Sequence, residues 1–306
     1  MELIKPGVNI NFVGKMRVFF YFSITVTLLS IIYLMVRGGP NMGIDFAGGT
    51  SVQIKFHQAT VIDKIRDSLK PIHLENSIIQ QVGAGQDNEY LLRTEMSTSD
   101  LKGLHDQIAE AMAVVYGKDS FDMRKIEMVG PKAGKDLRQK GLLALCLALL
   151  GMLLYITWRY EFRYALGGII ALVHDVIVSV AVFTLFQREF TLTVIAALLT
   201  IIGFSINDTV VVFDRIRENV RKNPKQNLGE VINASINQTL SRTILTSFTV
   251  FIVVVVLYFF GGTVINDFAF IMLIGVIFGT YSSIFIASPL VLVWETYRPS
   301  KRIRKK

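Results

Sequence analysis

Long apolar runs dominate the pattern of hydrophobic and polar positions along this chain of 306 residues. A helix that rises 1.5 Å per residue needs about 20 apolar residues to cross the hydrocarbon core of a bilayer. Six runs are of about that length, at residues 18–36, 141–158, 165–186, 190–213, 244–260 and 268–294. The pattern therefore predicts a multi-pass α-helical membrane protein with six transmembrane helices.

The segment between the first two runs, residues 37–140, has the patterning of a soluble α+β domain. Alternating or β-rich stretches predict strands, and apolar positions at helical spacing predict helices. The expected strands are 50–56, 77–82, 89–94 and 120–129, and the expected helices are 60–69 and 97–116, the second with an N-cap among residues 97–100. The order βαββαβ is the ferredoxin-like arrangement, which by itself carries no function.

The basic residues are distributed unevenly over the loops. Residues 159–164 and 214–243 contain many Arg and Lys, whereas the opposite loops 187–189 and 261–267 contain only Arg188. Because cytoplasmic loops are enriched in basic residues, this bias predicts that both termini (residues 1–17 and 295–306) are cytoplasmic and that the α+β domain is exported. The sequence after the first run lacks a small-residue cleavage site, so we expect that run to be an uncleaved span.

The net charge of +8 does not indicate nucleic-acid binding. The exported segment is neutral, with 14 basic and 14 acidic residues, and the excess lies in short segments beside the apolar runs, above all in residues 298–306. Basic residues in such places are topology signals that also contact anionic lipid.

Asp208 lies inside the otherwise apolar run 190–213, and its polar neighbour Asn207 is a further candidate for the proton pathway. An ionisable group at membrane depth costs roughly 2.5–3.5 kcal/mol on insertion scales, which marks it as a functional candidate. Arg242 begins the following apolar run, and its long side chain can reach a similar depth. The pair predicts a switch in which a proton neutralises Asp208 and releases Arg242. The alternatives are a static ion pair and an Asp208 that faces a water-filled vestibule.

Asp175, preceded by His174, lies in the third run on a face of small residues, so it is expected to face other helices. It is a candidate for a second proton site, and equally for a hydrogen-bonding anchor. Gly203, Gly275 and Gly279 are candidates for close helix packing, either within the chain or against a partner.

Residues 214–243 form a polar connection that ends in a segment with helical apolar spacing, residues 228–240. This segment predicts either an amphipathic helix in the cytoplasmic interface or a continuation of the fifth span into water.

Several kinds of chemistry are not supported. Residues 130–136 (Gly-Pro-Lys-Ala-Gly-Lys-Asp) lack the glycine spacing and the Ser or Thr of a phosphate loop, which argues against an ATP site. The single cysteine, Cys146, lies inside an apolar run, and the four His form no ligand-spaced pair. We therefore expect neither an enzyme nor a metal or organic cofactor.

Five segments together resemble the SecD/SecF family of the bacterial protein-export machinery, within the resistance-nodulation-division superfamily, and specifically its SecF side. They are residues 43–50 (Gly-Ile-Asp-Phe-Ala-Gly-Gly-Thr), 129–137, 174–175, 203–219 and 241–244. From the residues alone, the first of these is a glycine-rich hinge, with Gly43, Asp45, Phe46, Gly48 and Gly49 as its candidate residues.

The resemblance implies a subunit of the inner membrane that works with SecD, the SecY-E-G channel and YajC on unfolded exported chains. It implies that proton flow drives late steps of translocation, with Asp208 and Arg242 in the proton path. Sodium is used by some members of the family. The alternatives are a small-molecule or lipid exporter subunit of the same superfamily and a non-transporting scaffold of the translocon.

Overall fold

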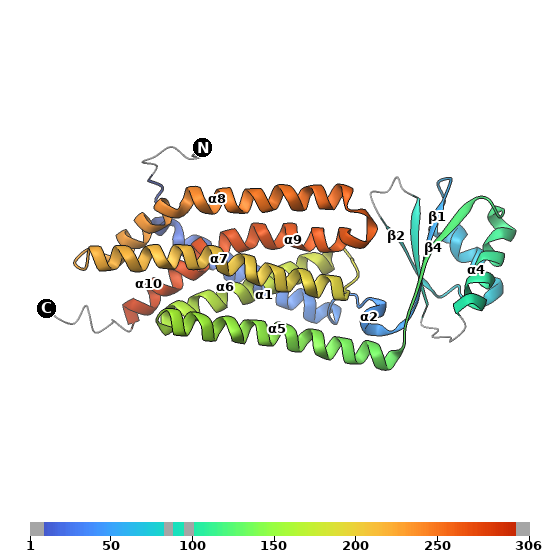
Figure 1. The fold of residues 1–306 in the computed structure, drawn as a ribbon, viewed down its shortest axis with the longest axis horizontal. Coiled ribbons are helices and arrows are strands. Elements are labelled where there is room, and N and C mark those ends of the chain that lie inside the picture. Colours follow the sequence, from blue (N-terminus) through green and yellow to red (C-terminus); the bar gives the residue numbers. More distant parts are fainter. Residues whose placement is uncertain (1–8, 83–87, 95–100, 298–306) are drawn as a thin grey trace.

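The computed structural model describes residues 9–82, 88–94 and 101–297. It consists of an elongated bundle of long helices with a small α+β domain at one end (Figure 1). The beginning of the first bundle helix and the end of the last lie together at the opposite end of the bundle.

The bundle contains the six long apolar helices expected from the sequence. They are α1 (Phe12–Arg37), α5 (Pro131–Arg159), α6 (Phe162–Leu185), α7 (Leu192–Lys222), α8 (Leu228–Phe260) and a last span made of α9 (Gly262–Ser282), the π-helical turn η2 (Ser283–Ala287) and α10 (Ser288–Tyr297). Each is long and apolar enough to cross a membrane. The predicted fold class is confirmed.

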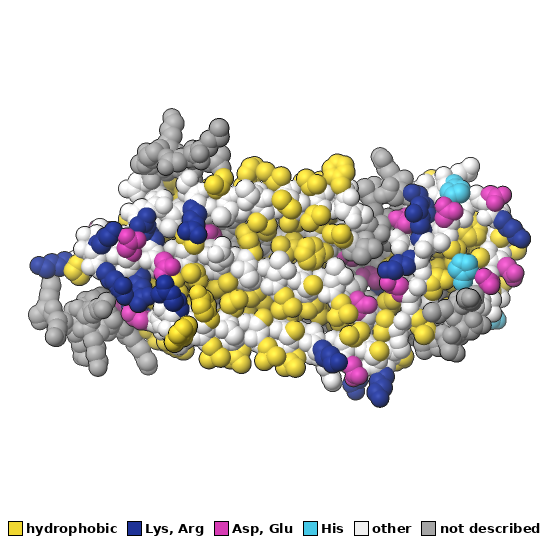
Figure 2. Space-filling view, viewed as in Figure 1, with side chains coloured by type: hydrophobic (Ala, Val, Ile, Leu, Met, Phe, Trp, Pro, Cys, Tyr) yellow, Lys and Arg dark blue, Asp and Glu magenta, His cyan; other side chains and the backbone are white. Residues whose placement is uncertain are grey.

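Helix α9 packs against α6, α7 and α8, and these contacts build the interior of the bundle. In their most apolar windows, 56% of α6, 56% of α7 and 61% of the last span are buried, against 11% for α1, α5 and α8. The latter three helices therefore present large apolar side chains on the outside. On α5 and α8 these side chains form part of a hydrophobic belt along the bundle between charged ends (Figure 2). This is the surface that a bilayer covers.

The α+β domain lies between α1 and α5 and has the predicted order of elements. Its elements are β1 (Gly49–Phe56), α3 (Ile62–Leu69), η1 (Lys70–Ile72), β2 (Ile78–Val82), β3 (Glu89–Thr94), α4 (Leu101–Tyr116) and β4 (Phe121–Val129). The antiparallel sheet has the order β2-β3-β1-β4, and α3 and α4 supply part of its core. The N-cap expected at residues 97–100 lies outside the described residues.

A four-residue helix, α2 (Ile44–Ala47), joins the bundle to the domain. It follows the end of α1 and directly precedes the central strand β1.

The segment expected as a loop with a separate helix, residues 214–243, is mostly a continuation of the two neighbouring spans. Helix α7 extends to Lys222, and residues 228–240 belong to the single helix α8. The two extensions are held to each other, because the Asn219 amide donates hydrogen bonds to Ser235 and Gln238, both at 2.9 Å. Of the two alternatives for residues 228–240, the structure therefore has the continuation of the fifth span.

Candidate functional site

Asp208 lies on α7 where this helix contacts α8, and its side chain is buried. Its Oδ1 accepts a hydrogen bond of 2.7 Å from the Thr243 hydroxyl on α8. Its Oδ2 has no hydrogen-bond partner among the residues that the structure describes. One half of the carboxyl group is thus anchored, and the other half is buried without a partner among these residues.

Arg242 immediately precedes Thr243, but its side chain is exposed on the outer surface of α8. Within the described part of the chain its guanidinium makes no ion pair with Asp208, and Thr243 occupies the place expected for it. Asn207, the other polar neighbour of Asp208, is likewise exposed. The structure therefore brings Asp208 together with Thr243, and it leaves Asn207 and Arg242 on the surface.

An outward face of α7 is unusually small and polar for a helix of membrane-spanning length. The exposed residues of this outer α7 face, spaced three or four positions apart, are Ala196, Thr200, Gly203 and Asn207. A methyl group at Gly203 would meet no atom of the described chain within 4 Å. Small and polar residues on a transmembrane helix favour close contact with another helix. Gly203 thus lies on a face that the described residues leave uncovered.

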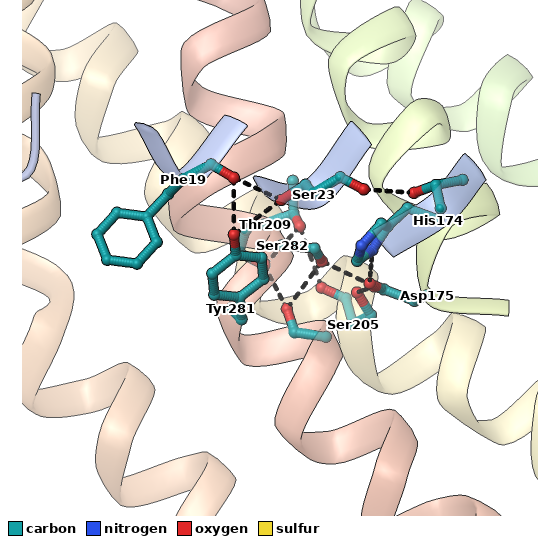
Figure 3. A network of polar contacts seen from close by, with 11 residues as sticks. Phe19, Ser23, His174, Asp175, Ser205, Thr209, Tyr281 and Ser282 are labelled. Carbon is teal, nitrogen blue, oxygen red and sulfur yellow. Dashed lines mark hydrogen bonds and ion pairs between the residues drawn. The ribbon is translucent and has the colours of Figure 1, made fainter. Parts of the chain in front are cut away.

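Asp175 lies deeper in the bundle, on α6, and is completely buried. Its Oδ2 accepts hydrogen bonds from Ser205 on α7 (2.7 Å) and Ser282 on α9 (2.8 Å), and its Oδ1 lies 3.0 Å from Nδ1 of His174 (Figure 3). Both carboxyl oxygens are therefore engaged, and the group joins three helices.

Two further polar contacts between helices lie near Asp175 (Figure 3). The Thr209 hydroxyl lies 2.8 Å from that of Ser283, and the Tyr281 hydroxyl lies 2.8 Å from that of Ser23 on α1. The π-helical turn η2 begins at Ser283, directly after Ser282. Such turns are frequent at functional sites.

Ser205, Ser282 and Thr243 are not among the site residues predicted from the sequence. In apolar runs such residues have the signature of small packing positions, because a hydroxyl can satisfy itself on the preceding turn of its own helix. The frequent Ser and Thr residues in the apolar runs around Asp175 and Asp208 could have indicated hydrogen-bond partners for these two carboxyl groups.

The two other candidate glycines lie where α9 approaches α7. A methyl group at Gly275 would come within 2.3 Å of Ile201 Cδ1, and one at Gly279 within 3.0 Å of Ser205 Cβ. The second approach allows α9 to place Ser282 beside the same carboxyl group that Ser205 contacts.

The motif of residues 43–50 lies at the junction between the domain and the bundle. The Phe46 side chain is buried in the bundle core, with its ring 6.0 Å from that of Phe190. Gly48 and Gly49 have positive φ angles of 79° and 113°, which glycine adopts without strain. Gly43 contacts Phe190 in the connection between α6 and α7, and Asp45 contacts Leu192 at the start of α7.

An ion pair between Arg93 on β3 and Glu189 on the α6–α7 connection spans the same junction. Both side chains are largely buried, and Arg93 also donates to the Met42 carbonyl at 2.7 Å. Burial raises the pKa of Glu189 above its usual range, and the Arg93 cation offsets part of this increase. Within the described residues, no three His, Cys, Asp or Glu side chains are grouped to hold a metal ion.

The fold and its buried carboxyl groups define a class: a six-span membrane protein with a small α+β domain inserted after the first span. Comparison with known proteins gives its family. Residues 108–297 match the model for the C-terminal region of the protein export membrane proteins SecD and SecF, and residues 33–60 match the SecD/SecF GG motif. The chain belongs to the SecD/SecF family, on its SecF side.

Curated relatives are similar over nearly their whole length. The protein translocase subunit SecF of Desulfurispirillum indicum is 46% identical over 292 residues, which cover 93% of this chain and 92% of the relative. SecF of Vibrio alginolyticus is 41% identical over 291 residues, covering 95% and 91%.

Two crystal structures of SecDF have the same fold. That of SecDF from Thermus thermophilus, described as a translocon-associated membrane protein, is 32% identical with a TM-score of 0.86, over 97% of this chain. The super-membrane-facing form of SecDF is 33% identical with a TM-score of 0.72, over the whole chain. This chain spans only 40% and 41% of the length of those two SecDF chains.

Proposed function

We propose that this chain acts with SecD as a subunit of the protein-export machinery that uses the proton-motive force in late steps of translocation. The observation that carries the proposal is Asp208, a buried carboxyl group with one oxygen anchored by Thr243 and the other without a partner among the described residues. A group with this environment can gain and lose a proton without dismantling the interior of the bundle.

Proton exchange at Asp208 would change the position of the Arg242 side chain. Ionised Asp208 attracts the Arg242 cation. Arg242 lies on the same turn of α8 as Thr243, and its side chain is long enough to reach toward the carboxylate. Protonation removes that attraction, so Arg242 returns to the outside. A proton that crosses the membrane field supplies about 2.3 kcal/mol per 100 mV, enough to shift an equilibrium between two such arrangements.

The charge distribution supports an orientation with both termini in the cytoplasm and the α+β domain in the periplasm. Arg and Lys gather at the end of the bundle where α1 begins and α10 ends (Figure 2). Basic residues favour the cytoplasmic side, where they also contact anionic lipid. A bacterial inner membrane location is the one that membership of the SecD/SecF protein-export family suggests.

The outer α7 face supports SecD as the direct partner. It carries Asn207 and Gly203 beside Asp208, and the described residues leave it uncovered. In the solved SecDF structures, a region similar to this chain makes up about two fifths of a longer chain. SecY-E-G, YajC and the unfolded exported polypeptide are the further partners that membership of the family suggests, and sodium is the alternative coupling ion.

Export of a reporter protein, with and without a proton gradient, tests the proposal. Asp208→Asn keeps the size and hydrogen bonding of the side chain but cannot ionise. We expect this variant to assemble with SecD and to show gradient-dependent export reduced at least tenfold. Asp214→Asn, an exposed carboxyl six residues further along α7, is the matched control and should export normally. Unchanged export by Asp208→Asn in assembled complexes would make the chain a scaffold instead.

A further inference from the structure

The helix that carries Asp208 is held at its other end by a residue of the junction motif. The backbone N–H of Leu192, the first residue of α7, donates a 2.9 Å hydrogen bond to Oδ2 of Asp45 on α2. The two residues are 147 positions apart in the sequence. Asp45 therefore serves α7 as a cap supplied by a different element.

This contact fits the electrostatics of a helix start. The first N–H groups of a helix lack partners within it, and the N-terminus carries a partial positive charge that attracts a carboxylate. Thr191 occupies the N-cap position of α7, but its side chain makes no capping hydrogen bond. Asp45 supplies both the acceptor and the negative charge that α7 otherwise lacks there.

Backbone contacts reinforce the attachment between this motif and the start of α7. The Gly43 N–H donates to the Phe190 carbonyl at 2.8 Å, and the Phe190 N–H donates to the Asn41 carbonyl at 2.7 Å. A methyl group at Gly43 would come within 2.8 Å of the Thr191 side chain. Residues 41–45 and 190–192 are thus joined along their length.

The same motif is joined equally closely to the α+β domain. Strand β1, one of the two central strands of the sheet, begins at Gly49, two residues after α2 ends. A methyl group at Gly48 would come within 3.0 Å of Pro131 Cα at the start of α5, which itself continues from β4. Arg93 of β3 donates to the Met42 carbonyl. Little freedom remains between the domain and α2.

We propose that Asp45 is a positioning residue that couples α7 to the α+β domain, so that a displacement of α7 after proton exchange at Asp208 is transmitted to the domain. The first residue of α7 lies 16 residues, or about 24 Å, from Asp208 along a continuous helix. This inference rests on the proposed function and names the mechanical contact that it requires.

A distance measurement between spin labels tests the coupling in the complex with SecD, reconstituted in a bilayer. One label replaces Val114 on the exposed face of α4, the other replaces Phe260 at the end of α8, and Cys146 is changed to Ser. The effect of Asp208→Asn on the label–label distance is measured in the wild-type background and again with Asp45→Ala. We expect Asp45→Ala to remove more than half of the change.

Two further variants separate the contact from the fold. Asp45→Asn keeps an acceptor for the Leu192 N–H and should retain most of the change. Leu192→Pro removes the donor together with a partly exposed leucine side chain, at a first helical position where proline is well tolerated, and should act like Asp45→Ala. Asp63→Asn is the matched control, because Asp63 is an exposed carboxylate on α3 of the α+β domain; it should leave the change in distance as in the wild type.

The outcomes distinguish the two proposals. If Asp208→Asn changes the distance equally with and without the Asp45–Leu192 contact, Asp45 does not transmit the motion and the inference is overturned. If Asp208→Asn leaves the label–label distance unchanged in the wild-type background, the ionisation of Asp208 does not move the domain, and the proposed function itself is contradicted. If Asp45→Ala does not assemble, Leu192→Pro decides by the same criterion.

Discussion

Two buried carboxyl groups in one helical bundle have opposite environments. Asp175 is completely buried, and both of its oxygens contact polar groups from α6, α7 and α9. Asp208 is anchored through one oxygen, and the helix surface beside it carries exposed polar residues. Burial alone therefore does not identify an exchange site. A fully engaged carboxyl group is suited to hold helices together, whereas a half-engaged one can change partners.

The largest expected effect is on stability, and it falls on Asp175. Asp175→Ala removes three polar contacts between buried groups, which at about 0.6–1.7 kcal/mol each predicts a loss of about 2–5 kcal/mol. Asp208→Ala removes one such contact and should cost about 1 kcal/mol. Thermal unfolding of both variants in the same detergent measures the difference. Equal losses of stability in the two variants would show that Asp175 does not anchor the helices more strongly than Asp208.

A second variant should make Asp175 resemble Asp208. Replacing Ser205 and Ser282 together by Ala leaves Oδ2 of Asp175 without its two donors, and we expect a loss of about 2 kcal/mol. Ser179→Ala is the control, since this equally buried hydroxyl on α6 has no partner among the described residues and should cost little. A double variant as stable as its control would show that the two serines do not anchor Asp175.

A smaller effect is expected from the single anchor of Asp208. Thr243→Val removes the hydroxyl but keeps the shape of the side chain, so it should cost about 1 kcal/mol and lower gradient-dependent export by up to about fivefold. Thr243→Ser retains the donor and should behave like the wild type. Normal export by Thr243→Val would mean that Asp208 needs no anchor to work.

The smallest expected effect is a pH dependence of the docking between the α+β domain and the bundle. It comes from Glu189, which is paired with Arg93 where the two meet. Burial raises its pKa when the domain is docked, despite Arg93, while Asp45 and Asp267 also lie near and raise it further. Protons therefore bind the docked form more tightly than an undocked form with an ordinary Glu pKa. Docking should be strongest below that ordinary pKa and weaken as the pH rises through the raised one.

Hydrogen exchange of the β3 amides across this pH range measures the docking. Glu189→Gln should make protection nearly independent of pH. Protection that increases with pH in the wild type would reverse the sign assigned to Glu189.

The sequence was sufficient to predict the regular elements and the two carboxyl groups. Long apolar runs and the βαββαβ pattern depend on periodicity along the chain, and both were confirmed. Asp175 and Asp208 could be identified because a charged residue in an apolar run is rare.

The partners of these groups could not be predicted in the same way. Arg242 was expected beside Asp208 because of its charge, but a shift of one residue on a helix turns the side chain by about 100°, and Thr243 faces the carboxyl group in this structure. The cap that Asp45 gives to α7 joins residues far apart in sequence, which only the tertiary fold brings together.

Proton flux into liposomes tests the central claim most directly. The complex of this chain with SecD is reconstituted around a pH-sensitive dye, a gradient is applied, and wild type is compared with Asp208→Asn and Asp175→Asn. The account predicts that Asp208→Asn reduces the flux to that of protein-free liposomes, while assembled Asp175→Asn retains at least half of the wild-type flux. Wild-type flux through Asp208→Asn, or flux abolished only by Asp175→Asn, would contradict it.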